Sequence, residues 1–106
     1  MQIKIHQINH DRDENRAAFM SLERLERYGI AFDRSIYDCV YAGEVDAEGL
    51  EDIFYIFNIG DIDRVENPES YRGHSLSVSD VVEMDGKFFF CDSFGWKEIP
   101  FEQQEK

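Results

Sequence analysis

Apolar and polar residues alternate in several short segments, which predicts β-strands there. The first segment runs over residues 3–8 (IKIHQI), and the second, after a charged loop, over residues 16–20 (RAAFM). A third covers residues 36–42 (IYDCVYA), whose β-branched and aromatic residues favour strands. We expect three of its side chains to share one face: Tyr37, Cys39 and Tyr41.

The last third of the chain predicts a hairpin and a further strand. Residues 81–84 and 87–92 flank Asp85 and Gly86, a pair that suits a two-residue turn because both positions need positive φ. Three consecutive phenylalanines in the second of these strands predict that it is covered on both faces and lies inside the sheet. After one more turn, residues 96–101 predict a last strand.

The clearest helical periodicity lies in residues 50–58, where apolar residues recur at spacings of three and four: Leu50, Ile53, Phe54 and Phe57. Further apolar residues make this helix hydrophobic on nearly all sides: Tyr55, Ile56 and Ile59. Such a helix is either buried in the domain, which we expect, or covered by a partner. A shorter helix is predicted over residues 22–28, between Ser21 as its N-cap and Gly29.

Together these elements predict a single α+β domain over residues 1–106, an antiparallel sheet of about five strands with one main helix. Strand order cannot be read from the pattern. Cys39 and Cys91 fall in predicted strands, so we expect both to be reduced thiols in the core. The chain has no apolar run of membrane-spanning length, and its start lacks the features of a signal peptide. A cytoplasmic protein is therefore expected.

The negative charge is concentrated in the middle of the chain. Its formal net charge is −12, and residues 38–69 hold ten acidic residues against one arginine. Direct binding to nucleic acid or to an anionic membrane is not expected, because both would repel such a chain. A partner protein with a basic surface fits it better. The candidate binding residues are Glu44, Asp46, Glu48, Glu51, Asp52, Asp61, Asp63 and Glu66.

Residues 73–80 (GHSLSVSD) contain the residue types of a hydrolytic triad. A triad needs side chains that converge in space, and one short segment rarely provides this. The structural interpretation assigns these polar residues to turns and caps, with His74 or Ser75 bonding loop backbone and Asp80 accepting backbone N–H groups. Asp92 is expected to cap the turn that leads to Gly95.

Metal binding finds little support in the sequence. His6 and His10 stand four residues apart, a spacing that suits a metal only on a helix, whereas a strand and a loop are predicted there. Asp61, Asp63 and Glu66 resemble part of a calcium loop, but the required glycine and distal glutamate are missing. We expect no metal and no cofactor.

Two segments are specific enough to indicate a family: residues 73–82 (GHSLSVSDVV) and residues 92–96 (DSFGW). Supported upstream by residues 3–8, 36–41 and 50–58, they resemble the YodL-like domain family, small domains of uncertain function in conjugative and phage-like elements of Firmicutes. The resemblance implies mobile-element biology and supplies no catalytic residues. The motif residues, interpreted as structural, are Gly73, His74, Ser75, Ser77, Ser79, Asp80, Asp92, Gly95 and Trp96.

The chain departs from the family pattern at three places. Cys91 stands where valine is usual, and Trp96 stands where phenylalanine is usual. The loop between Asn58 and Pro68 is longer than the family norm and carries acidic residues. We therefore expect the acidic cluster to be a property of this member.

Three hypotheses for the function follow. The favoured one is a non-catalytic domain of a mobile element that binds a basic protein and inhibits a host defence nuclease by presenting DNA-like negative charge. The second is a generic accessory or interaction module whose acidic residues serve only solubility. The third is a small hydrolase built on His74 and Asp80.

Overall fold

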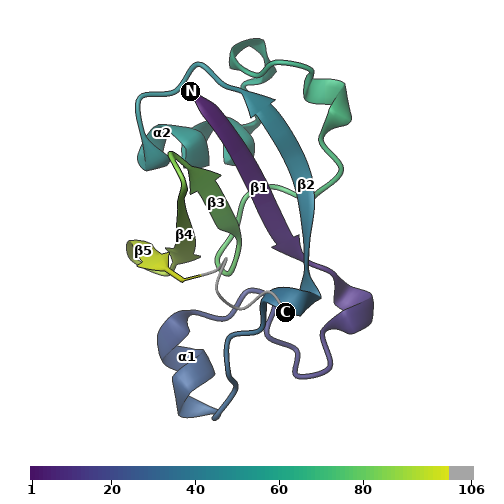
Figure 1. The fold of residues 1–106 in the computed structure, drawn as a ribbon, viewed down its shortest axis with the longest axis vertical. Helices are drawn as coiled ribbons and strands as arrows, with labels where there is room; N and C mark the ends of the chain where they lie inside the picture. The colour runs from purple at the N-terminus through teal and green to yellow at the C-terminus, as the bar shows by residue number, and fades with distance from the viewer. Residues whose placement is uncertain (101–106) are drawn as a thin grey trace.

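The centre of the fold is a five-stranded antiparallel sheet with the strand order β2-β1-β3-β4-β5 (Figure 1). The structure is a computed structural model that describes residues 1–100. Its strands are β1 (Gln2–Ile8), β2 (Tyr37–Glu44), β3 (Val81–Met84), β4 (Lys87–Asp92) and β5 (Gly95–Ile99). The predicted α+β fold is confirmed. Of the predicted last strand, Phe101 lies outside the described residues.

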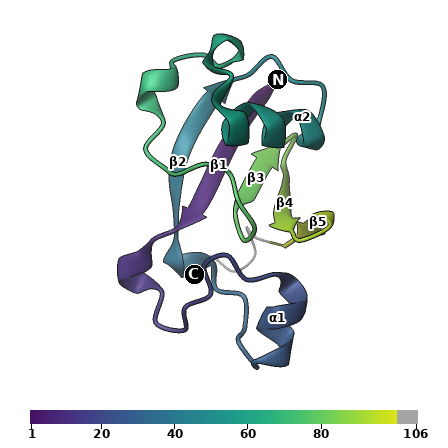
Figure 2. The ribbon, with the colours of Figure 1, turned by 180° about the vertical axis from the view of Figure 1, so that it is seen from behind.

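Two helices accompany the sheet, as predicted. Helix α1 (Leu22–Arg27) begins at Ser21, whose hydroxyl oxygen accepts a hydrogen bond of 3.2 Å from the Arg24 amide. Helix α2 (Leu50–Tyr55) continues into a π-helical turn over Ile56–Gly60. Helix α2 covers one face of the sheet, which Figure 2 shows from behind, while α1 lies at the opposite end of the molecule.

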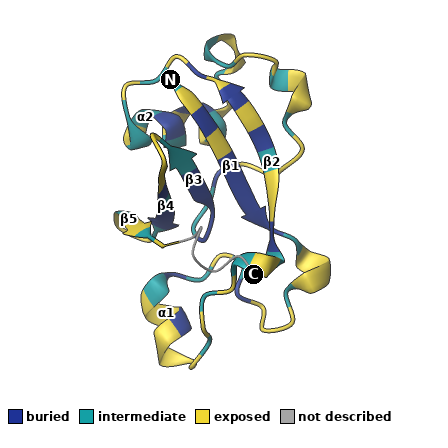
Figure 3. Ribbon diagram, viewed as in Figure 1, coloured by how far each residue is buried: buried dark blue, intermediate teal, exposed yellow. Residues whose placement is uncertain are grey.

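The sheet separates two clusters of buried side chains, and neighbouring residues such as Val81 and Val82 belong to different clusters because strand side chains alternate. The cluster beneath α2 contains Ile3, Ile5, Tyr41, Val82, Ile53, Ile56 and Leu76. The cluster on the other face contains Ile8, Tyr37, Val81, Phe88, Phe90, Ala17 and Leu25. Figure 3 shows this alternation in the first half of β1 and the last half of β2, whereas residues 5–8 of β1 are all buried.

The hairpin prediction is confirmed. Asp85 and Gly86 have φ values of 54° and 76° in the turn between β3 and β4, the positive values that a tight two-residue turn requires. Strand β4 pairs with β3 on one side and β5 on the other, so it lies inside the sheet. Its Phe90 is fully buried.

One prediction about β2 is wrong because the strand contains a bulge. Ile5 pairs with Tyr41 and His6 pairs with Cys39, which leaves Val40 without a partner in β1. Tyr41 therefore packs beneath α2, whereas Tyr37 packs in the cluster on the other face. The three residues do not form one buried face, and Cys39 is exposed rather than a core thiol; only Cys91 is buried.

The strand predicted for residues 16–20 is also wrong. Arg16 and Phe19 have φ values of 55° and 68°, which interrupt an extended chain, and the segment forms turns instead. The carboxylate of Asp13 holds it in place by accepting hydrogen bonds from the amides of Ala17 (2.7 Å) and Ala18 (3.0 Å).

Helix α2 and its π-helical turn are less buried than expected. Ile53 and Ile56 are buried in the core as predicted. Tyr55 and Ile59, however, are 52% and 65% exposed, and Ile62 in the following loop is 61% exposed. The apolar residues on the outer side of the helix are therefore not covered within the described part of the chain.

Candidate functional site

The motif segment 73–80 is joined to the sheet by the buried side chain of Gln7 in β1. The Gln7 amide nitrogen donates to the Tyr71 hydroxyl (3.1 Å), the His74 carbonyl (3.0 Å) and the Asp80 carboxylate (3.0 Å). The Gln7 side-chain oxygen accepts from the His74 amide at 3.1 Å. One strand side chain thus sets the path of the whole loop.

Asp80 supplies the buried carboxyl group at the centre of this network, with 1% of its surface exposed. Its carboxylate also accepts a hydrogen bond of 2.8 Å from the Ser77 amide. Burial raises the pKa of Asp80 to about 7, although the bonds from Ser77 and Gln7 oppose that shift. The backbone of Asp80 accepts from the Cys91 amide at 2.7 Å and so extends the pairing between β3 and β4.

Ser79 connects the motif to the segment 16–20. This buried residue has a φ of 87°, and its hydroxyl oxygen accepts a hydrogen bond of 2.9 Å from the Phe19 amide. Its carbonyl accepts from the Tyr37 hydroxyl at 2.6 Å. The ring of Phe19, 51% exposed, lies against the His74 ring with 5.4 Å between centroids.

The residues of the hydrolase hypothesis make separate contacts. His74 Nδ1 lies 2.7 Å from the Ser75 carbonyl oxygen, and the Ser77 hydroxyl donates to that same oxygen at 2.9 Å. The Asp80 carboxylate contacts Gln7 and the Ser77 backbone instead. Among residues 1–100, no hydrogen bond links the His74 ring to Asp80 or to a serine hydroxyl.

The second motif segment ties β4 to α1. Asp92 accepts hydrogen bonds from the amides of Leu22 (3.2 Å) and Ser93 (2.9 Å), so it anchors the start of α1 as well as the turn to Gly95. Gly95 has a φ of 88°, which favours glycine. Trp96 pairs with Cys91 across the strands and packs against the cluster beneath α2.

The acidic candidates lie at the end of the molecule where β2 finishes and α2 begins (upper end of Figure 1). Two backbone links bring their two segments together: the Asp46 amide donates to the Arg64 carbonyl (2.8 Å), and the Glu66 amide to the Glu44 carbonyl (2.9 Å). A bridge between Val45 and Val65 completes the junction. We call the following set the acidic end: Glu44, Asp46, Glu48, Glu51, Asp52, Asp61, Asp63 and Glu66.

Two members of the acidic end form ion pairs. Glu44 pairs with the amino group of Met1, and Asp52 pairs with Arg64. The hydrogen bond from Arg64 lowers the pKa of Asp52. Asp52 in turn raises the pKa of Arg64 by accepting its hydrogen bond, and the negative charges of Asp46 and Asp61 act in the same direction. The other six acids make no ion pair within the described range.

A groove of about 310 Å³ lies beside the acidic end, between the π-helical turn and the segment 68–75. We call it the Tyr71 groove; its lining includes Phe57, Ile62, Val65, Tyr71, His74 and Ser75. The rings of Phe57 and Tyr71 are stacked, with 5.4 Å between centroids and an interplanar angle of 21°. Motif residues therefore form one wall of the Tyr71 groove. Ile62 and Val65 line the other wall, and acidic residues stand next to them in the sequence.

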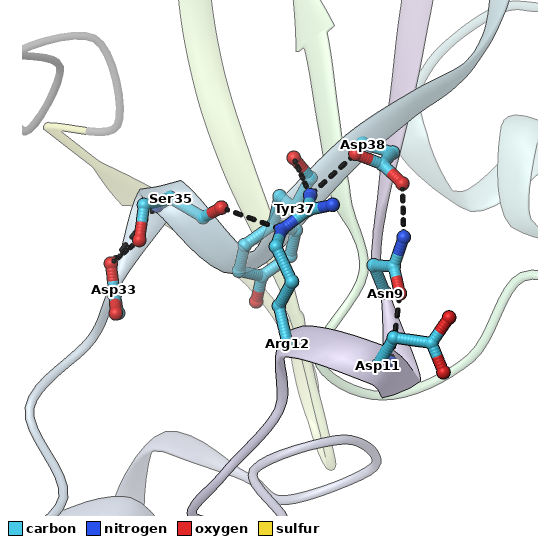
Figure 4. A network of polar contacts seen from close by, with 7 residues as sticks. All are labelled: Asn9, Asp11, Arg12, Asp33, Ser35, Tyr37 and Asp38. Carbon is cyan, nitrogen blue, oxygen red and sulfur yellow. Dashed lines mark hydrogen bonds and ion pairs between the residues drawn. The ribbon is translucent and has the colours of Figure 1, made fainter.

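A second cavity, of about 390 Å³, lies beneath the loops 11–17 and 30–37. Figure 4 shows the polar contacts that close these loops on each other. Arg12 donates to the Ser35 carbonyl (3.2 Å) and pairs with Asp38, which also accepts from Asn9 at 2.8 Å. The hydrogen bonds from Arg12 and Asn9 lower the pKa of Asp38. We interpret these contacts as structural, because they hold the two loops together.

Sequence reasoning missed Gln7, Tyr71 and Phe19 as parts of this site. Gln7 gives a weak signal, because it is a polar residue where the alternation of Ile3 and Ile5 calls for an apolar one. Phe19 gives none, since its left-handed conformation depends on Ser79, sixty residues away along the chain.

Two further findings concern ligands and membranes. Within residues 1–100, no three His, Cys, Asp or Glu side chains group closely enough to hold a metal ion. His6 is buried in β1 near Glu83, whereas His10 stands beside Phe19. None of the helices in the same range is long and apolar enough to cross a membrane.

The fold and site define a small α+β domain in which a polar motif loop is attached to a five-stranded sheet. The family model of the YodL-like domain matches residues 2–101, and the chain belongs to this family. No curated protein and no solved structure matches the chain. The family has no assigned function, so belonging to it identifies the type of domain but not its activity.

Proposed function

We propose that this domain is a non-catalytic protein-binding module of a mobile genetic element. In this proposal it inhibits a nuclease or another DNA-binding protein by presenting the acidic end to the surface that normally holds phosphates. The observation that carries the proposal is the convergence of two acidic segments, residues 44–52 and 61–66, at one end of the molecule.

The electrostatics of the acidic end favour a basic partner. Six of its carboxylates make no ion pair within residues 1–100, so their charge is available to a partner. At physiological salt, exposed charges act together on a partner when they lie within a Debye length of one another, about 8–10 Å. A single-sign surface of this kind speeds association with an oppositely charged protein and makes that association sensitive to salt.

The contacts of the motif residues support a structural role for them. The Asp80 carboxylate is committed to Gln7 and the Ser77 amide, and the His74 ring faces a carbonyl of its own loop. A hydrolase would need the imidazole within hydrogen-bond reach of both its nucleophile and its carboxylate.

Neutralising the acidic end tests the proposal. The test variant combines Glu48→Gln, Glu51→Gln, Asp61→Asn and Asp63→Asn. The control combines Asp11→Asn, Glu14→Gln, Glu26→Gln and Glu98→Gln, which removes the same charge from exposed positions elsewhere. Each immobilised protein is incubated with host lysate, and the captured proteins are identified and competed with duplex DNA.

We expect the native domain and the control to retain basic DNA-binding proteins at low salt, and duplex DNA or high salt to displace them. The test variant should lose that capture. Equal loss from both variants would mean that net charge alone acts, and unchanged capture by the test variant would contradict the proposal.

The second candidate is an accessory module whose acidic residues serve solubility and local structure. It is favoured by two ion pairs, which link Glu44 at the end of β2 to the amino group of Met1 and Asp52 in α2 to Arg64. It predicts that the test variant binds the domain's physiological partner as tightly as the native chain does.

A further inference from the structure

We infer that the outer side of α2 and its π-helical turn packs against a helix of the basic partner, with lysine or arginine opposite Glu51 and aliphatic side chains opposite Tyr55 and Ile59. This inference rests on the proposed function and identifies an apolar anchor beside the acidic end. We call the three residues Glu51, Tyr55 and Ile59 the outer ridge.

The outer ridge is a line of side chains that faces away from the sheet. Its members follow one another at intervals of four residues, and positions at this spacing form a ridge on a helix surface. The inner side of the helix is fixed by Ile53 and Ile56, which are buried in the cluster beneath α2. Glu51, Tyr55 and Ile59 are all exposed, so the ridge is accessible to a partner (Figure 2 shows α2 on the near side of the sheet).

Exposed apolar side chains are concentrated at this place. Six large hydrophobic side chains are exposed within residues 1–100, and three of them fall in the short stretch 55–62: Tyr55, Ile59 and Ile62. Single exposed apolar residues are ordinary on a protein surface, whereas a group of them marks an interaction site. Tyrosine is also enriched among the residues that carry most of the binding energy of an interface.

The charge along the outer ridge favours a basic partner. Residues 46–63 contain no lysine, arginine or histidine. Glu51 lies one helical turn before Tyr55 on the same side of the helix, so a cation opposite Glu51 would adjoin the apolar contact. Neither Glu48 nor Glu51 makes an ion pair within the described residues.

The cationic groups of the surrounding elements do not cancel this charge. Arg64 and the amino group of Met1 are already in ion pairs. Lys87 lies on the same face of the sheet as α2, because its partner across the β3–β4 turn packs beneath α2. Arg72 and His74 belong to the segment on the other side of the Tyr71 groove. The eight carboxylates of the acidic end outnumber these groups, so the surface stays negative.

A helix of a basic protein is the occupant that fits both features. A ridge of side chains at four-residue spacing packs into the groove between the ridges of a second helix. A second copy of this chain would bring two acidic ends together, and an anionic membrane would repel them. An apolar helix without basic residues would leave Glu51 facing it without a countercharge.

Amide shifts in the ¹⁵N-labelled full-length chain test the inference with three capped amphipathic helical peptides. The first peptide has a leucine face and a lysine face. The second has alanine in place of every leucine, and the third has glutamine in place of every lysine. We expect the first to shift the amides of Tyr55 and Ile59, and the other two to bind roughly fivefold more weakly or not at all, because each lacks one of the two contacts.

A matched pair of variants separates the apolar contact from the charge. Tyr55→Ser removes the exposed ring from the ridge, and Tyr28→Ser makes the same change at the end of α1, where the exposed fraction is similar (57% against 52%). Both variants should unfold at the Tm of the native chain, because both rings are exposed. Only Tyr55→Ser should weaken the lysine–leucine peptide, by about tenfold, without changing the salt dependence of binding. Glu51→Gln should instead reduce that salt dependence.

Several outcomes overturn the inference and leave the proposed function standing. They are the absence of shifts at Tyr55 and Ile59, equal binding of the leucine and alanine peptides or of the lysine and glutamine peptides, and equal effects of Tyr55→Ser and Tyr28→Ser. A concentration-dependent dimer that Tyr55→Ser dissociates would also overturn it, because the outer ridge would then contact a second copy. The proposed function fails separately, when neutralising the acidic end leaves partner capture intact.

Discussion

Replacing Gly73 with alanine should destabilise the domain through a single buried contact. A Cβ atom at this position would lie 2.0 Å from the Gln7 side-chain oxygen and 2.8 Å from its Cδ, with Val40 Cγ2 at 3.0 Å. Gln7 is 3% exposed, so its side chain cannot turn into solvent to make room. A glycine is needed at the first position of the motif because the Gln7 side chain lies against its backbone. The φ angle of Gly73 is not in the left-handed region, so conformational freedom is not the reason.

The size of the effect follows from the bonds that Gln7 makes. Displacing its amide disturbs four hydrogen bonds, to Tyr71, His74 and Asp80. A typical bond contributes about 1 kcal/mol net, and a buried group left without a partner costs about 1–3 kcal/mol. We expect the free energy of unfolding to fall by roughly 3 kcal/mol, which lowers Tm by roughly 10–20 °C in a domain of this size.

Urea denaturation followed by circular dichroism measures this loss. Gly49→Ala is the control, because a Cβ there meets no atom within 4 Å and its backbone is extended. The double variant Gly73→Ala with Gln7→Ala isolates the clash, since removing the Gln7 side chain makes room for the new methyl group. The double variant should be no less stable than Gln7→Ala alone. Additive losses, or a stability of Gly73→Ala equal to that of the control, would refute the reasoning.

Three further predictions concern buried groups. Burial keeps the Asp80 carboxyl protonated up to about pH 7 in the folded protein, whereas the unfolded chain releases this proton near pH 4. The free energy of unfolding should therefore fall by up to about 4 kcal/mol as the pH rises between these values. Urea titrations should show a flatter pH dependence for Asp80→Asn, and an unchanged pH dependence would disprove the prediction. A thiol reagent should modify the exposed Cys39 in the native protein, but it should react with the buried Cys91 only after unfolding, because burial raises the pKa of Cys91 to about 12. Simultaneous reaction of both thiols would contradict the structure. Phe90→Ala should lower the free energy of unfolding by about 3–5 kcal/mol and Phe94→Ala by less than about 0.5 kcal/mol, and similar losses would show that burial is not the cause.

Most individual elements could be predicted because their signals are local. The Asp85-Gly86 turn, the Ser21 cap and the apolar spacing of residues 50–57 each act over a few residues, and all three correspond to the structure. The family motif could be located for the same reason. Its contacts could not, because Gln7 is far along the chain from Tyr71 and Asp80 and nothing in the pattern pairs it with them.

The sequence by itself determined the antiparallel α+β class, the hairpin and the excess of acidic residues in its middle third. Only the tertiary structure decided the strand order, the bulge that turns Tyr41 to the face opposite Tyr37, and the joining of residues 44–52 to residues 61–66. The physical reason is that periodicity and turn chemistry depend on neighbours in the chain. Register, burial and convergence of charge depend instead on which distant segments pack together, and that choice is made by the whole core at once.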